Sequence, residues 1–524
     1  MKKAPWLIVC VFVLAGCAGN VQWRSSSANP PPSTESASEE VPYLDYEHYQ
    51  TTLLGEPGLK SHDRGVLRPH SISYIEFDDQ GDFLDRQQLV DAMAHIPNGP
   101  NRLIVFYAHG WQNNTRSADV GQFNALLAHL AHTLNEPTQK RDGGMPWEVY
   151  GVYLGWRGTL YDPSDIYPPQ MASQQTTVED ILGAAKPSPY NILASAPKQF
   201  TFWSRKDAAG RMAGAPLLEA INMISARART KPSPGHPALR TKTILIGHSF
   251  GAYVIEKTVL QSISTIPPQM DDKGTAYITP PADLVILLNS AAPAIYAKEF
   301  IEFLKWHSVG QDQPPFVISV SSEADWATKD LFPVGTIAAS AFDIGSYQGK
   351  ATYQGANEKT FFTHTPGHTD YLPSFDACRT GKIPSDEFAS DYPNEWIFYR
   401  NLFPKDFAPT DLSFVAWGGG FAKTGKDDPA EIWQLKPTRT VDPNQVPFND
   451  TPYWLVRVPS AIIASHSDVW CPNSMNLLTS LIRLSGIADA KSGLRTIKLA
   501  PEAAPAAGRD QLAPLLNYDA STSK

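Results

Sequence analysis

The sequence predicts an α/β protein in which helices flank a mostly parallel β-sheet. Short, continuously apolar runs recur along the chain, as expected of strands that are buried on both faces, and segments with helical spacing of apolar residues separate them. Hydrophobic residues make up 42% of the 524 residues and aromatic residues 11%, which excludes a chain that is disordered as a whole.

The predicted elements follow one another along the middle of the chain. Strands are expected at 102–108, 148–154, 241–246, 283–288, 316–320 and 453–458, and helices at about 120–134 and 252–262. The segment between each of these strands and the next is long enough to form a helix. This order favours parallel strands joined by crossovers.

The first residues have the pattern of an export signal. A basic start precedes an apolar run from 4 to 16, which is too short to span a bilayer, because a spanning helix needs about 20 residues. The run ends in Leu-Ala-Gly before Cys17 and resembles the lipobox of bacterial lipoproteins. The resemblance implies cleavage before Cys17, acylation of that cysteine and, with Ala18 after it, anchoring in the bacterial outer membrane.

The ends of the chain differ from its middle in composition. We expect a signal peptide at 1–16, a lipid-anchored disordered tether at 17–60, a globular domain at 61–499 and a loosely ordered tail at 500–524. The tether is rich in Ser, Pro and Glu and buries too little apolar surface to offset the entropy of ordering it.

Charge excludes one class of partner. Lys and Arg total 44 against 53 Asp and Glu, a formal charge of −9. A nucleic-acid partner is not expected, because phosphate contacts need a basic face.

Two of the four cysteines belong to the domain. Cys378 and Cys471 either form one disulfide in an oxidising envelope or stay as buried thiols. No pair of cysteines has zinc-ligand spacing.

The motif Gly247-His248-Ser249-Phe250-Gly251 carries the predicted chemistry. It fits the pattern G-x-S-x-G, and it lies between a buried strand and a helix, which is the setting of a nucleophile elbow. The glycines permit a tight turn, and the helix start directs N–H groups toward a developing oxyanion. Ser249 is the predicted nucleophile; the alternative is a Gly/Ser-rich turn without chemistry.

This context resembles the serine esterase and lipase branches of the α/β-hydrolase superfamily, over roughly 100–330 and 453–480. The resemblance implies an oxyanion hole made by the backbone N–H groups of Trp111 and Phe250. His109, in the same turn as Trp111, is expected to pack and hydrogen-bond locally.

A serine nucleophile needs a base and an orienting carboxylate, which follow in the order Ser, acid, His in this superfamily. Asp325, after the fifth predicted strand, is the expected acid, with Glu323 as its local rival. His466, in a Ser-His-Ser-Asp turn after the last strand, is the expected base. His364 and His368 are its rivals.

Two long insertions depart from the family pattern, at about 158–240 and 330–450. Loops of this length without a function of their own are uncommon. Both are rich in Pro, Trp and Tyr, and we expect lid or cap elements that shape the substrate pockets. Surface decoration and a docking surface for another envelope protein are the alternatives.

The segment 364–369, His-Thr-Pro-Gly-His-Thr, resembles a zinc-binding segment of metallo-β-lactamase-type hydrolases. Those enzymes also need an upstream His-x-His cluster, and this chain contains no His-x-His. No metal and no other cofactor is therefore expected.

The sequence thus predicts a lipid-anchored serine hydrolase of the bacterial envelope that cleaves carboxylic esters of small molecules or lipids. The alternative is an inactive hydrolase-like lipoprotein that binds a ligand or a protein partner. Esterase, lipase, thioesterase and amidase activities are not separated by the residues, because one fold hosts all of them.

Overall fold

The fold is known from a computed structural model. It describes residues 22–24, 38–41, 70–99, 101–111, 113–115, 117–134, 147–158, 196–230, 240–272, 274, 276–305, 315–339, 352–353, 356–369, 372, 375–383, 413–417, 430–437, 453–484 and 497–498. The predicted signal peptide, Cys17 and the tail at 500–524 lie outside the described residues.

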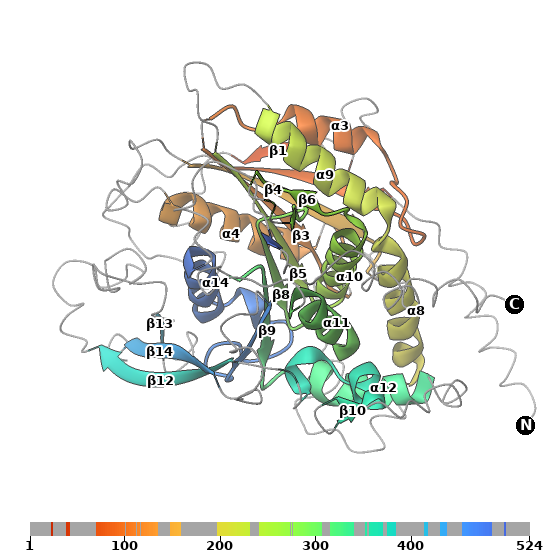
Figure 1. Ribbon diagram of the computed structural model, residues 1–524, viewed down its shortest axis with the longest axis vertical. Coiled ribbons are helices and arrows are strands. Elements are labelled where there is room, and N and C mark those ends of the chain that lie inside the picture. Colours follow the sequence, from red (N-terminus) through yellow and green to blue (C-terminus); the bar gives the residue numbers. More distant parts are fainter. Residues whose placement is uncertain are drawn as a thin grey trace, which may run out of the picture.

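An eleven-stranded sheet runs through the molecule in the order β1-β2-β4-β3-β5-β8-β9-β15-β12-β14-β13 (Figure 1). Its strands are β1 (Ser38–Val41), β2 (His70–Phe77), β3 (Asn101–Ala108), β4 (Trp147–Trp156), β5 (Arg240–His248), β8 (Leu284–Leu288), β9 (Val317–Ser322), β12 (Phe375–Ile383), β13 (Ser413–Trp417), β14 (Ala430–Pro437) and β15 (Tyr453–Val458). All pairs from β2 to β12 are parallel, and the pairs at the two ends of the sheet are antiparallel. The predicted mostly parallel sheet is confirmed.

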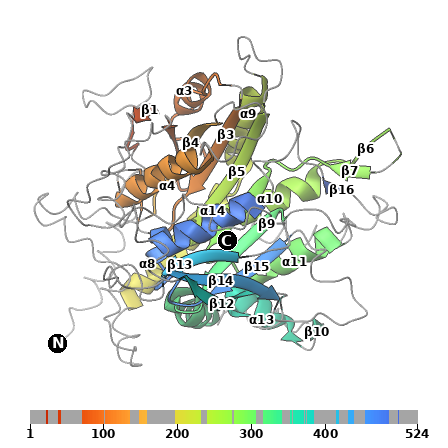
Figure 2. The same cartoon turned by 90° about the vertical axis from the view of Figure 1, so that its left-hand side faces the viewer.

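Helices cover both faces of the sheet (Figures 1 and 2). One face carries α4 (Ala118–Leu134) and α14 (Pro472–Leu484), and the other carries α3 (Gln87–Ala94), α8 (Ala196–Met212), α9 (Ala215–Thr230), α10 (Phe250–Thr265) and α11 (Ala294–Lys305). Two short helices follow, α12 (Phe332–Ala339) and α13 (Glu358–Thr363); α13 packs against α11, and α12 packs against α13. Small separate sheets are formed by β6 (Gln269–Met270), β7 (Ala276–Ile278) and β16 (Ile497–Lys498), and by β10 (Thr352–Tyr353) and β11 (Ala356–Asn357).

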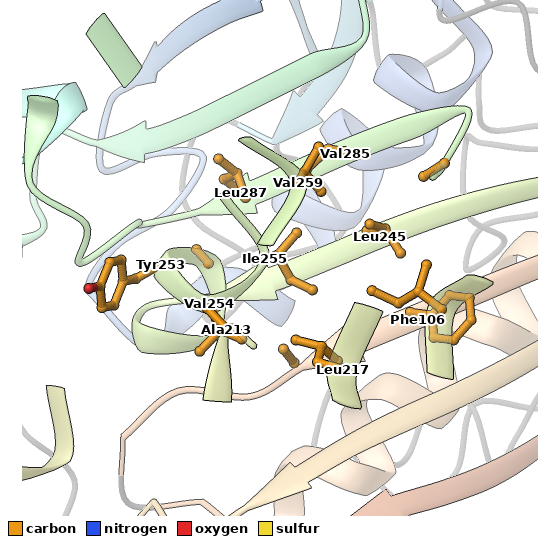
Figure 3. Close-up of a cluster of buried hydrophobic side chains, with 14 of the residues drawn as sticks. Phe106, Ala213, Leu217, Leu245, Tyr253, Val254, Ile255, Val259, Val285 and Leu287 are labelled. Carbon is orange, nitrogen blue, oxygen red and sulfur yellow. The ribbon is translucent and has the colours of Figure 1, made fainter. Parts of the chain in front are cut away.

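Alternation along the strands divides the core into two layers. In β3, Ile104 and Phe106 face the α10 side, whereas Leu103 and Val105 face the α4 side. All four side chains are fully buried, so this strand reads as one continuous apolar run. Figure 3 shows the α10 side, where Ile255 and Val259 of α10, one helical turn apart, point at side chains of β5 and β8. Each such buried side chain contributes about 1.5–3 kcal/mol of burial free energy.

Part of each predicted insertion belongs to the core. Leu217, Ile221 and Ile224 of α9 are buried against the sheet, so this helix is an ordinary crossover between β4 and β5 and not a lid. In the second insertion, β12, β14 and β13 extend the sheet beyond β15. We expected both insertions to consist of lid or cap elements, and this expectation is wrong for α9, β12, β13 and β14.

The predicted disordered tether is also wrong in part. Ser38–Val41 forms β1 and pairs with β2, and the backbone N–H groups of Trp23 and Arg24 donate to the carboxylate of Glu76. These backbone hydrogen bonds order two segments whose composition offers little apolar surface.

Candidate functional site

Ser249 occupies the turn between β5 and α10. Its backbone has φ 55° and ψ −118°, a conformation that costs a non-glycine residue of order 1–3 kcal/mol. A Cβ on Gly247 would clash with the backbone of Ala252, and a Cβ on Gly251 would clash with the carbonyl oxygen of Ala108. The motif's glycines are therefore required by the close approach of α10 to its own strand and to β3.

His466 links Ser249 to Asp325. The Nε2 atom of His466 lies 2.9 Å from Ser249 Oγ, and its Nδ1 atom lies 2.8 Å from Asp325 Oδ2. Because a carboxylate only accepts hydrogen bonds, Nδ1 carries the proton and Nε2 is left to accept from the serine hydroxyl. The structure thus brings together the predicted nucleophile, base and acid.

The topology of the sheet explains this meeting. Ser249, Asp325 and His466 follow the carboxyl ends of β5, β9 and β15, and these ends lie at one edge of a parallel sheet. β15 pairs directly with β9, with Ser322 opposite Val458, so the acid and base loops leave the sheet side by side.

Asp325 is fully buried and hydrogen-bonded on both oxygens. Thr328 donates its hydroxyl to Oδ2 at 2.6 Å and its backbone N–H to Oδ1 at 3.1 Å. Burial by itself raises the pKa of Asp325, but the charge of His466 and the hydrogen bonds from His466 and Thr328 outweigh it and hold the pKa below its ordinary value. The rival, Glu323, is exposed, and the carboxylate that bonds His466 Nδ1 is that of Asp325.

The two predicted oxyanion donors lie beside the serine. Phe250 is the first residue of α10, where backbone N–H groups have no acceptor within the helix. Gly110, next to Trp111, packs so closely on Ser249 that an added Cβ would lie 2.9 Å from the serine Cβ. Within the described part of the chain, neither the Phe250 nor the Trp111 N–H donates a hydrogen bond. Neither group is therefore committed to another acceptor among the described residues.

The carbonyl group of His466 is fixed by two side chains that sequence reasoning missed. Asn289 Nδ2 and His248 Nε2 both donate to the His466 carbonyl oxygen, each at 3.0 Å. Asn289 Oδ1 also accepts from the backbone N–H of Ser322 at 2.9 Å, so one side chain joins the ends of β8 and β9 to the His466 loop. Asn289 adopts φ 43°, which asparagine tolerates better than most residues. Its position directly after a buried strand was the available signal.

His248 and His109 are both neutral and buried. Burial and the neighbouring His466 lower the pKa of His248 to about 3, and burial lowers the pKa of His109 to about 4. His109 Nδ1 donates to the Gly110 carbonyl at 2.8 Å, and its Nε2 accepts from the Trp156 N–H at 3.1 Å. The His109 ring also stacks on the Trp156 ring. These contacts are the local packing expected from the sequence.

The turn at 364–369 supports Asp325 indirectly, through Thr328. His368 Nε2 donates to Thr328 Oγ1 at 3.1 Å, and Thr328 in turn donates to Asp325. Burial lowers the pKa of His368 to about 4, so its ring is neutral near pH 7. The His364 side chain is hydrogen-bonded to its neighbour Thr363 at 2.9 Å. Neither rival histidine contacts Ser249, and the described residues contain no cluster of three or more His, Cys, Asp or Glu arranged for a metal ion.

An aromatic group from the first insertion adjoins the candidate oxyanion hole. Phe202 of α8 packs against Phe250, with ring centroids 4.6 Å apart, and meets Trp111 edge-on at 5.5 Å. This is the described part of the insertion at 158–240 that reaches the site.

The two cysteines of the domain are free thiols, which removes the disulfide alternative. Cys471 donates to the Ile462 carbonyl at 3.0 Å, and burial raises the pKa of its thiol to about 12. Cys378 lies in β12.

None of the helices in the described residues combines the length and the apolar character needed to cross a membrane.

No protein-family model and no curated protein matches the chain. A solved structure, the crystal structure of an uncharacterized protein from Pseudomonas aeruginosa, is similar at 12% identity with a TM-score of 0.20. The match covers 46% of this chain and 38% of the Pseudomonas aeruginosa protein. This chain therefore matches well under half of the length of that protein.

Proposed function

We propose that the protein is a serine hydrolase of the α/β-hydrolase type that cleaves carboxylic esters. The observation that carries this proposal is the hydrogen-bonded chain from Ser249 through His466 to Asp325, with distances of 2.9 and 2.8 Å. An ionised carboxylate, an imidazole and a serine in a strained strand-to-helix turn form the arrangement that activates a hydroxyl for acyl transfer.

Acylation uses all three side chains. His466 Nε2 accepts the hydroxyl proton as Ser249 Oγ attacks the ester carbonyl, and Asp325 stabilises the imidazolium that forms. The tetrahedral oxyanion accepts hydrogen bonds from the N–H groups of Trp111 and Phe250. His466 then gives its proton to the departing alcohol, which leaves an acyl-serine.

Deacylation repeats these steps with water as nucleophile. His466 takes a proton from the water, the second tetrahedral intermediate uses the same two N–H donors, and the proton returns to Ser249 Oγ as the acid leaves. The partly exposed rings of Trp111 and Phe202, packed on the buried Phe250 that follows the serine, favour an ester with an apolar acyl group.

We further propose that Cys17 carries a lipid and anchors the enzyme in the bacterial outer membrane. The support is the Leu-Ala-Gly-Cys ending of the apolar run at the start of the chain. Mass spectrometry of the mature protein tests this, with an acylated N-terminal Cys17 as the expected result and loss of membrane attachment in Cys17→Ser.

The activity is tested by labelling the purified protein with a fluorophosphonate probe and mapping the adduct by mass spectrometry. We expect an adduct on Ser249 and a fall in ester hydrolysis of roughly a million-fold in Ser249→Ala. A folded protein that takes no label and cleaves no ester would contradict the proposal and favour an inactive hydrolase-like binding protein.

A further inference from the structure

Three residues near the start of the mature chain are bound to the domain. The backbone N–H groups of Trp23 and Arg24 donate to Glu76 at 3.0–3.1 Å. The guanidinium group of Arg24 donates to the Thr115 carbonyl at 3.1 Å and lies 4.3 Å from the centre of the Tyr74 ring. We call residues 22–24 the docked segment.

The domain provides a buried receptor for this segment. The Glu76 side chain is 1% exposed, and it accepts hydrogen bonds from Thr115 Oγ1 at 2.6 Å and from Gln88 Nε2 at 3.1 Å. Gln88 also donates to the Arg24 carbonyl at 3.0 Å. Without the docked segment, this buried carboxylate would lose its two backbone donors, which is costly for a charged group.

The receptor lies at the same edge of the sheet as the candidate site. Glu76 is the penultimate residue of β2, and Thr115 lies in the loop after β3 that also carries Trp111. The strand order β2-β4-β3-β5 places Glu76 three strand spacings, or about 14 Å, from the strand that ends before Ser249.

Chain length then limits how far this edge can lie from the lipid. Gln22 follows Cys17 by five residues, which span at most about 18 Å. If β1 were the first held segment, the 21 residues from Cys17 to Ser38 would span about 70 Å and leave the domain free to turn.

We propose that the docked segment holds the carboxyl edge of the sheet against the membrane in which Cys17 is anchored, so that Ser249 acts on esters presented at a lipid surface. The proposal rests on the proposed function and on acylation of Cys17. It assigns the docked segment a role in orienting the catalytic edge, beyond simple tethering.

Two insertions of one flexible 20-residue Gly/Ser linker test this in the full-length, acylated protein on phospholipid vesicles. The first, between Gly19 and Asn20, lengthens the connection ahead of the docked segment by about 25 Å. The matched control, between Ser33 and Thr34, adds the same linker between the docked segment and β1, where it leaves that connection unchanged.

The readout is energy transfer to acceptor-labelled lipids from a donor dye on a bio-orthogonal side chain. The dye replaces either Glu323, exposed at the carboxyl end of β9, or Met270, exposed beyond the end of α10 at the opposite edge. We expect stronger transfer from position 323 than from 270. The first insertion and Arg24→Ala should each reduce transfer from 323 at least twofold, and the control insertion should not.

Equal transfer from the two positions, or an equal loss with both insertions, would overturn the orientation. The hydrolysis arm compares a vesicle-embedded ester with a water-soluble ester. We expect the first insertion to slow hydrolysis of the vesicle-embedded ester at least threefold and to leave hydrolysis of the water-soluble ester unchanged. An equal effect on the two esters would also overturn the orientation. A wild-type protein that cleaves neither ester contradicts the proposed function, whereas the energy-transfer result still decides the orientation.

Discussion

The serine half of the candidate site is held by backbone packing, whereas the acid–base half is held by side-chain hydrogen bonds. Ser249 is fixed by glycines that let α10 approach β3. Asp325 is instead fixed by Thr328, three residues after it, and His466 is fixed by Asn289, which lies at a separate strand end. The first half tolerates almost no change of shape, and the second depends on particular donors and acceptors.

The largest effect is expected from breaking the serine half. In Gly251→Ala, the new methyl group meets the carbonyl groups of Ala108 and His109, which are backbone atoms and cannot rotate away. We expect a lower melting temperature and a loss in kcat/KM of roughly 100-fold or more. The matched control is Gly121→Ala in α4, where an added Cβ meets nothing within 4 Å and should stabilise the helix by about 0.5–1 kcal/mol. Unchanged kinetics in Gly251→Ala would remove the distinction between the halves.

Asn289 is the next test, now of the acid–base half. Asn289→Gly keeps the positive φ but removes the hydrogen bonds to the His466 carbonyl and the Ser322 N–H. We expect kcat to fall roughly 10- to 100-fold with KM nearly unchanged, because His466 loses its position relative to Ser249. Steady-state kinetics measure this, and a change in KM alone would contradict it.

Thr328, which bonds Asp325, and His368, which bonds Thr328, give a graded pair of variants. Thr328→Val removes a hydroxyl donor to a charged carboxylate, so we expect about a tenfold loss in kcat/KM. His368→Ala removes only the donor to Thr328 and should cost about fivefold or less. His364→Ala, in the same turn, is the control and should behave as wild type. A larger loss in His368→Ala than in Thr328→Val would reverse the proposed order.

The smallest effect on activity is expected at the contact between α10, which follows Ser249, and β15, which precedes His466. Tyr453 of β15 donates to Glu256 of α10 at 2.8 Å, and burial raises the pKa of Glu256 from 4.5 to about 8. Between these pH values the folded protein keeps a proton that the unfolded chain has lost, so stability falls as pH rises. The slope is about 1.4 kcal/mol per pH unit for this one group. Denaturant unfolding at pH 5 and pH 8 measures it, and Glu256→Gln should flatten the difference.

The same contrast explains what the sequence could predict. The serine turn is encoded by five consecutive residues, so Ser249 and its neighbours could be read directly. Asp325 and His466 were found only through the order of strands. Their supports were not predicted. Asn289 contacts the carbonyl group of His466, which lies 177 residues later in the chain, and no local pattern distinguishes Thr328, three residues after Asp325, as a donor to that carboxylate.

Other misses have local causes. The spacing of Leu217, Ile221 and Ile224 has the helical period of a buried crossover helix, but their place within a long insertion led to the expectation of a lid. Residues 22–24 have a fixed conformation because they bind Glu76, a buried acidic residue whose role composition does not reveal.

β15 enters the sheet between β9 and β12, both of which precede it in the chain. Pairing of this kind joins residues far apart in sequence and forms late in folding, because a long loop must close first. His466 arrives with this strand. During folding, Ser249 therefore lacks its hydrogen-bond partner His466 until the last parallel strand is in place. If the proposed function holds, hydrolysis begins only at that point.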